Sequence, residues 1–214
     1  MMDAPAPAPV RLIVWSDYLC PWCYVAATRL HRVQEEFGDR VELEWRSYLL
    51  RPYPDPSRTL EKFRTYTQSW ARPAAEPDAP AFRVWESDAG PPSHSMPPHL
   101  VAKAAATFGG DAFERMHARL LRAYFAENGD ITDAETLLAL WADVGLPPAE
   151  FARAGDQGLV EAVVREHNEA VSLGLTGVPA VQMAANDIPL PGALPYESYR
   201  RWVARVLAGG PDGR

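Results

Sequence analysis

The chain has 214 residues, of which 47% are hydrophobic and 23% charged, as in an ordinary globular protein. Its formal net charge is −7, and because an acidic surface repels phosphate backbones we expect no nucleic-acid partner. No apolar run approaches the roughly 20 residues that cross a bilayer, so we expect no membrane partner.

The first ten residues alternate Ala and Pro and contain neither a basic residue nor an apolar stretch. A secretion signal needs both, so this beginning predicts a cytoplasmic protein. Residues 1–9 and 209–214 are expected to be flexible tails.

The first predicted elements form a strand–helix–strand unit. Val10 to Ser16 is almost entirely apolar, which predicts a strand buried on both faces. Helical spacing follows and stops at Gly38. Val41 to Tyr48 then alternates apolar and charged residues, as in a half-buried strand. Short connections predict that the two strands are parallel.

Prolines crowd Arg51 to Pro98, which predicts loops with one short helix over Leu60 to Trp70. A helical block follows, with two predicted capping boxes, Asp111 with Glu114 and Thr132 with Glu135. Its expected helices are Leu100 to Phe108, the segment opened by Asp111, the segment opened by Thr132, Pro147 to Ala154, and Leu159 to Leu173.

The end of the chain returns to strand spacing. Ala180 to Ala184 and Ile188 to Leu190 are predicted strands around a turn at Asn186-Asp187, and Pro189 restricts the second strand to an edge or bulge. Tyr196 to Leu207 is predicted to be an amphipathic helix. The whole order indicates an α/β protein with one sheet, helices on both faces, and one interruption.

The only two cysteines, Cys20 and Cys23, stand three positions apart where the first strand ends and the first helix begins. Pro21 suits the first position of a helix. There the helix dipole and its free N–H groups favour a thiolate on Cys20, which makes it the attacking sulfur. Cys23, one turn later, can form a disulfide with it and is the predicted buried, resolving thiol.

Two other roles for the cysteines were weighed. They could be inert core residues. They could also bind zinc with His94 and His99, but a helix N-terminus favours anions and no second cysteine pair exists. The prediction is therefore a redox pair without a metal.

The order of these motifs resembles the DsbA family. Cys20-Pro21-Trp22-Cys23 follows a strand, and Val178-Pro179 comes late in the chain. The cytoplasmic FrnE-like branch is the most similar, because it carries Cys-Pro-Trp-Cys.

The resemblance implies a thioredoxin fold, a central mixed sheet with flanking helices, interrupted by an all-helical domain. The thioredoxin-like domain would comprise residues 10–50 and 157–208, and the insertion residues 51–156. The Val178-Pro179 bond would be cis and face the cysteines, and the Val178 backbone would pair with an extended substrate. Pro21 and Trp22 would complete the substrate-binding surface.

The chain departs from the family pattern at the group that would accept the proton of Cys23. Val14 stands six residues before Cys20, where thioredoxin-like proteins often keep a buried acid. Asp17 is near in sequence, but its direction cannot be derived from spacing.

The predicted function is that of a thiol–disulfide oxidoreductase, of the protein disulfide isomerase or reductase type, acting on disulfide-containing proteins or peptides. No bound cofactor is expected, and glutathione or another thiol is the possible redox partner. The alternatives are a glutathione-dependent isomerase or kappa-class-like glutathione transferase, and a redox-gated binding protein. The substrate, the recycling partner, and the choice between monomer and homodimer stay open.

Overall fold

The computed structural model describes residues 9–184, 186 and 188–209. It contains a mixed four-stranded sheet in the order β2-β1-β3-β4. The strands are β1 (Val10–Ser16), β2 (Val41–Ser47), β3 (Ala180–Met183) and β4 (Leu190–Pro191). β1 pairs in parallel with β2 and antiparallel with β3, which pairs antiparallel with β4. The predicted thioredoxin fold is confirmed.

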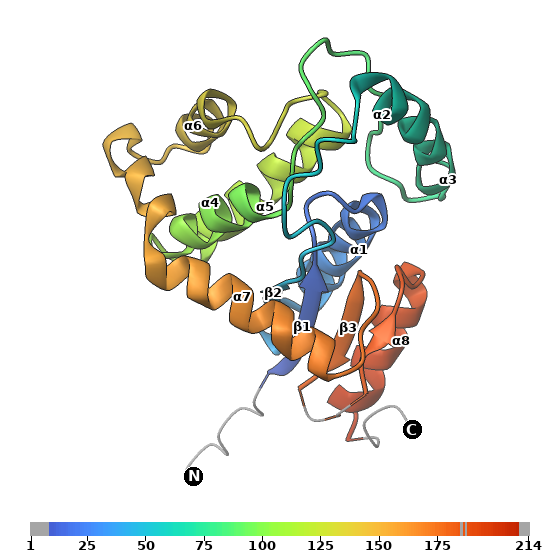
Figure 1. Cartoon of the computed structure of the whole chain (residues 1–214). Helices are drawn as coiled ribbons and strands as arrows, with labels where there is room; N and C mark the ends of the chain where they lie inside the picture. The colour runs from blue at the N-terminus through green and yellow to red at the C-terminus, as the bar shows by residue number, and fades with distance from the viewer. Residues whose placement is uncertain (1–8, 185, 187, 210–214) are drawn as a thin grey trace.

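Helices cover both faces of the sheet (Figure 1). α1 (Pro21–Phe37) and α8 (Tyr196–Leu207) pack on one face, against Leu12, Val14 and Val181. α7 (Gln157–Ser172) crosses the other face, where its Ala170 meets Ile13 and Trp15. β1 is therefore buried on both sides, as its apolar run predicts.

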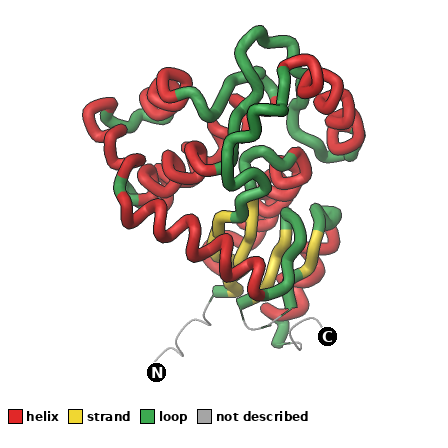
Figure 2. Tube along the Cα trace, in the orientation of Figure 1, coloured by secondary structure: helices red, strands yellow, loops and turns green. Residues whose placement is uncertain are grey.

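The insertion between β2 and α7 is helical (Figure 2). Its helices are α2 (Leu60–Thr67), α3 (Ala71–Ala74), α4 (Met96–Ala106), α5 (Gly110–Phe125) and α6 (Ala134–Asp143), with 3-10 turns η2 (Gln68–Trp70) and η3 (Pro148–Gly155). A further 3-10 turn, η1 (Gly38–Arg40), follows α1. No helix in the described part of the chain is long and apolar enough to cross a membrane.

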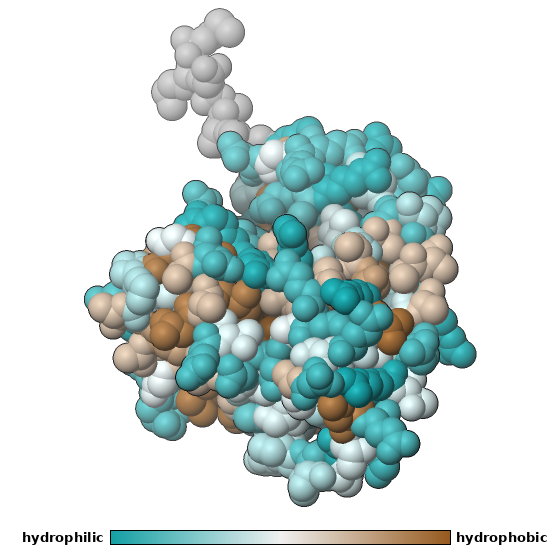
Figure 3. Space-filling view, turned by 90° about the horizontal axis from the view of Figure 1, so that it is seen from above, coloured by the Kyte–Doolittle hydropathy of each residue, from teal (hydrophilic) through white to brown (hydrophobic). Residues whose placement is uncertain are grey.

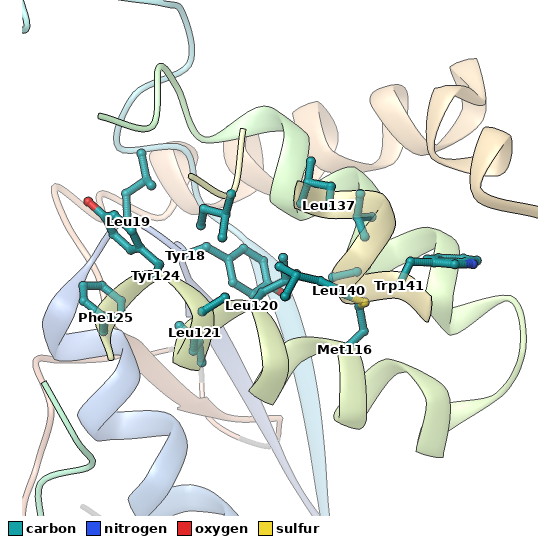
Figure 4. Packing of buried hydrophobic residues seen from close by; sticks show 14 of the residues in the cluster. Tyr18, Leu19, Met116, Leu120, Leu121, Tyr124, Phe125, Leu137, Leu140 and Trp141 are labelled. Atoms are coloured by element: carbon teal, nitrogen blue, oxygen red, sulfur yellow. The ribbon is translucent and has the colours of Figure 1, made fainter. Parts of the chain in front are cut away.

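The main apolar core joins the two parts of the molecule. Tyr18 and Leu19, which precede α1, pack with Leu120 and Leu121 of α5 and with Leu137 of α6 (Figure 4). This core contains residues from both sides of the predicted boundary at residues 50/51. The insertion therefore packs directly against the loop that leads to Cys20.

Both predicted capping boxes are wrong. The N-cap of α5 is Gly109, and Asp111 lies inside the first turn without a capping bond. The N-cap of α6 is Asp133, whose carboxylate accepts from the Thr136 N–H at 2.8 Å. The Thr132 hydroxyl is not available, because it donates to Asp130 and accepts from the Ser93 N–H.

Two other boundaries differ from the prediction. α4 begins at Met96 rather than Leu100, because Pro97 and Pro98 sit in its first turn, where a helix needs no N–H donors. β4 contains Pro191 rather than Pro189, at the sheet edge, where a missing N–H costs no ladder bond. The turn predicted at Asn186-Asp187 includes residue 187, which lies outside the described residues, as do residues 1–8 and 210–214 of the predicted tails.

Candidate active site

The two cysteines occupy the N-terminus of α1. Cys20 is the N-cap, with extended backbone angles (φ −96°, ψ 114°), and Pro21 is the first helical residue. The Cys23 N–H donates to the Cys20 carbonyl at 3.0 Å, which closes the first turn. The first turn contains no acidic residue, so its N-terminal partial positive charge is left for the Cys20 sulfur.

Both cysteines are free thiols, and they approach each other to 3.5 Å. Cys20 is 5% exposed and Cys23 is fully buried. The pair is thus close enough to form a disulfide with little movement, and only Cys20 has any contact with solvent. Of the two sulfurs, Cys20 is therefore the one that an incoming molecule can reach.

Cys20 lies against the loop before β3. Its thiol donates to the Val178 carbonyl at 3.2 Å, and the Val178-Pro179 bond is cis, as predicted. Val178 is half-buried and Pro179 is buried. The backbone of this loop therefore presents polar groups beside the sulfur that a substrate would reach.

The surface near this loop is partly apolar. Leu173 and Ile188, both exposed, line one groove with Val178 and Pro179. Pro21 and Trp22, expected to complete the substrate-binding surface, are both half-buried. The face toward which β1 points in Figure 1 is largely hydrophilic, with separate apolar patches (Figure 3).

Cys23 has a different environment. Burial raises the pKa of its thiol well above the ordinary value, and the neighbouring Cys20 raises it further. Hydrogen bonds from the Ser16 side chain and the Asp17 backbone act in the opposite direction. These two groups act on a sulfur that is fully buried.

Asp17 does not take the place of the missing acid at position 14. Its carboxylate accepts from the Leu19 N–H at 2.6 Å and the Leu50 N–H at 2.7 Å, and it also bonds the Ser95 side chain. Burial raises the pKa of Asp17 to about 6, although these bonds and Arg51 lower it. Its side chain thus holds the loop before Cys20 against the start of the insertion.

The histidines considered as zinc ligands make contacts of another kind. His99 packs edge-on against Tyr18, with ring centroids 4.9 Å apart, and His94 bonds Ser93. Across residues 9–184, 186 and 188–209, no group of three or more His, Cys, Asp or Glu side chains could hold a metal ion.

Sequence reasoning gave no role to Ser16, the last residue of an apolar strand, or to His117, and it considered His99 only as a zinc ligand. Both histidines are buried. A histidine on the apolar face of a predicted helix was the one available signal, and it does not say what the ring contacts.

Comparisons with known proteins agree with this geometry. The family model described as DSBA-like thioredoxin domain matches residues 11–203. An uncharacterized protein of Bacillus subtilis (strain 168), YwbO, is 26% identical over 203 residues, which cover 91% of this chain and 96% of that protein.

Two solved structures are similar over nearly the whole chain. A probable DsbA oxidoreductase from Streptomyces coelicolor has a TM-score of 0.71 and 26% identity, covering 93% of this chain and 90% of that one. The cytosolic disulfide reductase DsbM from Pseudomonas aeruginosa has a TM-score of 0.73 and 22% identity, covering 94% and 98%. The sheet order, the cis bond beside a helix-capping cysteine and the matched family model lead to one conclusion: this chain belongs to the DSBA-like thioredoxin domain family.

Proposed function

We propose that this protein is a thiol–disulfide oxidoreductase that exchanges disulfides of proteins or peptides through Cys20 and Cys23. The observation that carries the proposal is the pair itself: two free thiols 3.5 Å apart at a helix N-terminus, one slightly exposed and one buried. Exchange needs one thiolate to attack a substrate disulfide and a second thiol to resolve the mixed disulfide.

The proposed roles follow from exposure. The Cys20 thiolate attacks a substrate sulfur, and the substrate's other sulfur leaves. Cys23 then attacks Cys20, and the remaining substrate thiol departs. An extended substrate segment would pair with the Val178 backbone, while Trp22, Pro21 and Pro179 border the site.

The second thiol distinguishes this function from the glutathione-dependent alternatives. A conjugating enzyme or a glutathione-dependent isomerase needs to bind one thiol and has no use for an adjacent resolving cysteine. Fully buried Cys23, 3.5 Å from Cys20, has no other evident purpose. A redox-gated binding protein would keep the pair but would not turn over a disulfide substrate.

We propose further that the chain works as a reductase or isomerase in the cytoplasm, in the FrnE-like branch of the family. The Cys-Pro-Trp-Cys motif supports the branch, and the similar fold of a cytosolic disulfide reductase supports the compartment. Trp22 carries no charge beside Cys20, so we expect a reduction potential between about −270 mV, as for thioredoxin, and about −120 mV, as for DsbA. Glutathione or another thiol would then keep the pair reduced.

The test is the redox equilibrium of the pair in graded glutathione buffers, followed by fluorescence of Trp22 and Trp15. We expect one two-electron transition that is absent from Cys20→Ser. Without a transition in the wild-type protein, the proposal fails. A transition without turnover of a protein disulfide would favour the binding protein.

A further inference from the structure

Arg29, on α1, is a buried cation that binds two separate parts of the chain. Its side chain is 3% exposed. Its Nε and Nη2 donate to Asp78, and Nη2 also donates to Glu76, at 2.6–3.0 Å. Its Nη1 donates to the carbonyls of Ala193 and Leu194 at 3.0 and 3.2 Å. The planar fork of N–H donors makes both sets of bonds possible.

The two parts that the arginine binds lie far apart in the sequence. Glu76 and Asp78 belong to the loop that follows α3 in the insertion. Ala193 and Leu194 belong to the segment 192–194, between β4 and α8. The helix that carries the cysteines at its N-terminus therefore holds the insertion and this segment together through one side chain.

This segment also contacts the loop beside the exposed sulfur. The Gly192 N–H donates to the Pro179 carbonyl at 2.7 Å. Pro179 is bonded to Val178, whose carbonyl accepts from the Cys20 thiol at 3.2 Å. A continuous series of contacts therefore leads from the arginine, through the segment, to the attacking sulfur.

The Tyr199 hydroxyl of α8 bonds the segment as well. It accepts from the Leu194 N–H at 3.2 Å and donates to the Gly192 carbonyl at 3.4 Å, which is long for a hydrogen bond between oxygens. Hydrogen bonds from a charged donor are stronger than those of a neutral hydroxyl. We therefore expect Arg29 to contribute more than Tyr199 to the position of this segment.

We propose that Arg29 is a positioning residue, which fixes the segment 192–194 and through it the Val178 backbone. The inference rests on the proposed function, in which an extended substrate pairs with this backbone while Cys20 attacks its disulfide. A displacement of about 1 Å far from the reacting atoms can lower a rate by about 100-fold. Because Glu76 and Asp78 orient the guanidinium, the insertion takes part in positioning the substrate.

Two substrates with the same disulfide isolate this effect. In one, the cysteine of an extended peptide is linked to a coloured aromatic thiol, and in the other a single blocked cysteine carries the same thiol. Reduction of either substrate by the protein releases one coloured thiol and one cysteine thiol, while Cys20 and Cys23 are oxidised to a disulfide. The ratio of the two second-order rate constants therefore measures the benefit of the peptide backbone.

The test variant is Arg29→Met, which keeps a long side chain and removes every bond of the guanidinium. The matched control is Arg32→Met, on the same helix. Arg32 is exposed, and its guanidinium lies over the Tyr196 ring, 3.9 Å from the ring centroid. Both substitutions remove one positive charge from the same groove, and the first also removes the bonds to the segment 192–194.

We expect Arg29→Met to lower the ratio of the peptide rate constant to the single-cysteine rate constant by about 10-fold. Arg32→Met should leave this ratio within about twofold of the wild type. The rates are measured at a temperature at which circular dichroism shows every variant folded. A loss of folded protein lowers both rate constants equally, so the ratio separates positioning from stability.

Arg29→Lys decides the matter if Arg29→Met does not fold. The lysine keeps a positive charge for the two carboxylates, but its single ammonium cannot also bind the carbonyls as the guanidinium fork does. We expect the ratio to fall by about 5-fold or more in this variant.

An unchanged ratio in the folded Arg29 variant overturns the inference, and so does an equal fall in Arg32→Met. If the wild-type protein releases coloured thiol from neither substrate, the proposed function itself fails. A wild-type protein that reduces both substrates, together with an Arg29 variant that keeps the wild-type ratio, contradicts only the positioning role.

Discussion

The part predicted to be thioredoxin-like (residues 10–50 and 157–208) and the predicted insertion (residues 51–156) differ in how well the sequence pattern predicts where helices and strands begin and end. β1 and α8 begin and end where the sequence pattern places them, and α1 ends at Gly38 as predicted. In the insertion, both predicted caps are wrong. Apolar runs and glycines set the ends of a helix or strand through local backbone preferences. A capping side chain can instead form a hydrogen bond with a residue far away in the sequence, as the Thr132 hydroxyl does when it accepts from the Ser93 N–H. The two parts also contribute differently to the site. The predicted thioredoxin-like part supplies the cysteines, and the insertion supplies Leu120, Leu121 and Leu137, which pack with the loop before Cys20.

The largest expected effect belongs to the thioredoxin-like part alone. Cys20→Ser should lower disulfide turnover by about 1,000-fold or more, because the attacking sulfur is lost. Cys23→Ser should still attack but accumulate a mixed disulfide, which mass spectrometry of the reaction mixture would detect. Equal turnover by Cys20→Ser and wild type would show that the site lies elsewhere.

The next effect concerns the joint between the two parts. Arg29 of α1 has a side chain 3% exposed, and it binds Glu76 and Asp78 of the insertion at 2.6 Å. It also donates to the Ala193 carbonyl. Arg29→Met should lower the free energy of unfolding by about 2–3 kcal/mol, less than for a fully buried pair because the two carboxylates are partly exposed.

Urea unfolding measures this loss, and Arg200→Met is the control. Arg200 pairs with Glu36 at the surface, where its side chain is 43% exposed, so its removal should leave the urea midpoint close to that of the wild type. Similar losses in the two variants would mean that the joint does not stabilise the fold.

The third effect is a pH dependence that arises where the parts meet. The pKa of His99 is lowered to about 3, so its contribution to stability is present above pH 6.5 and is lost as pH falls toward 3. His117 acts in the same direction. Asp17 opposes them: its pKa is raised to about 6, so it adds stability as pH falls from 6 toward 3.8.

The stability lost through the two histidines should exceed the stability gained through Asp17. The free energy of unfolding should therefore fall as the pH is lowered from 7 to 5. His99 alone accounts for about 2 kcal/mol of that loss. Urea midpoints at the two pH values would measure it, and His99→Gln should remove about this part of the difference. A wild-type protein more stable at pH 5 would contradict the expected balance.

The smallest effect tests the helix ends of the insertion. Asp133→Ala should cost about 1 kcal/mol because it removes the N-cap of α6. Asp111→Ala, at the position that only the pattern predicts as a cap, should cost about 0.3 kcal/mol through the helix dipole. If thermal unfolding shows a larger loss of stability for Asp111→Ala than for Asp133→Ala, Asp111 is the capping residue that the sequence pattern predicts.

The sequence by itself determined the position of the dithiol, whereas the fold family came from the resemblance of its motif order to the DsbA family. A buried strand followed directly by Cys20-Pro21-Trp22-Cys23 predicts cysteines at a helix N-terminus, and a spacing of three puts them on one face. These are local consequences of chain geometry, so a single sequence suffices for them.

Only the tertiary structure decided what surrounds Cys23. Asp17 is near in sequence, yet its carboxylate accepts hydrogen bonds from the Leu19 and Leu50 N–H groups instead of facing the Cys23 thiol. His99 of α4 and His117 of α5 both pack their rings edge-on against Tyr18, in the loop before Cys20. Burial and hydrogen-bond satisfaction depend on which distant side chains pack together, and no local pattern encodes that packing.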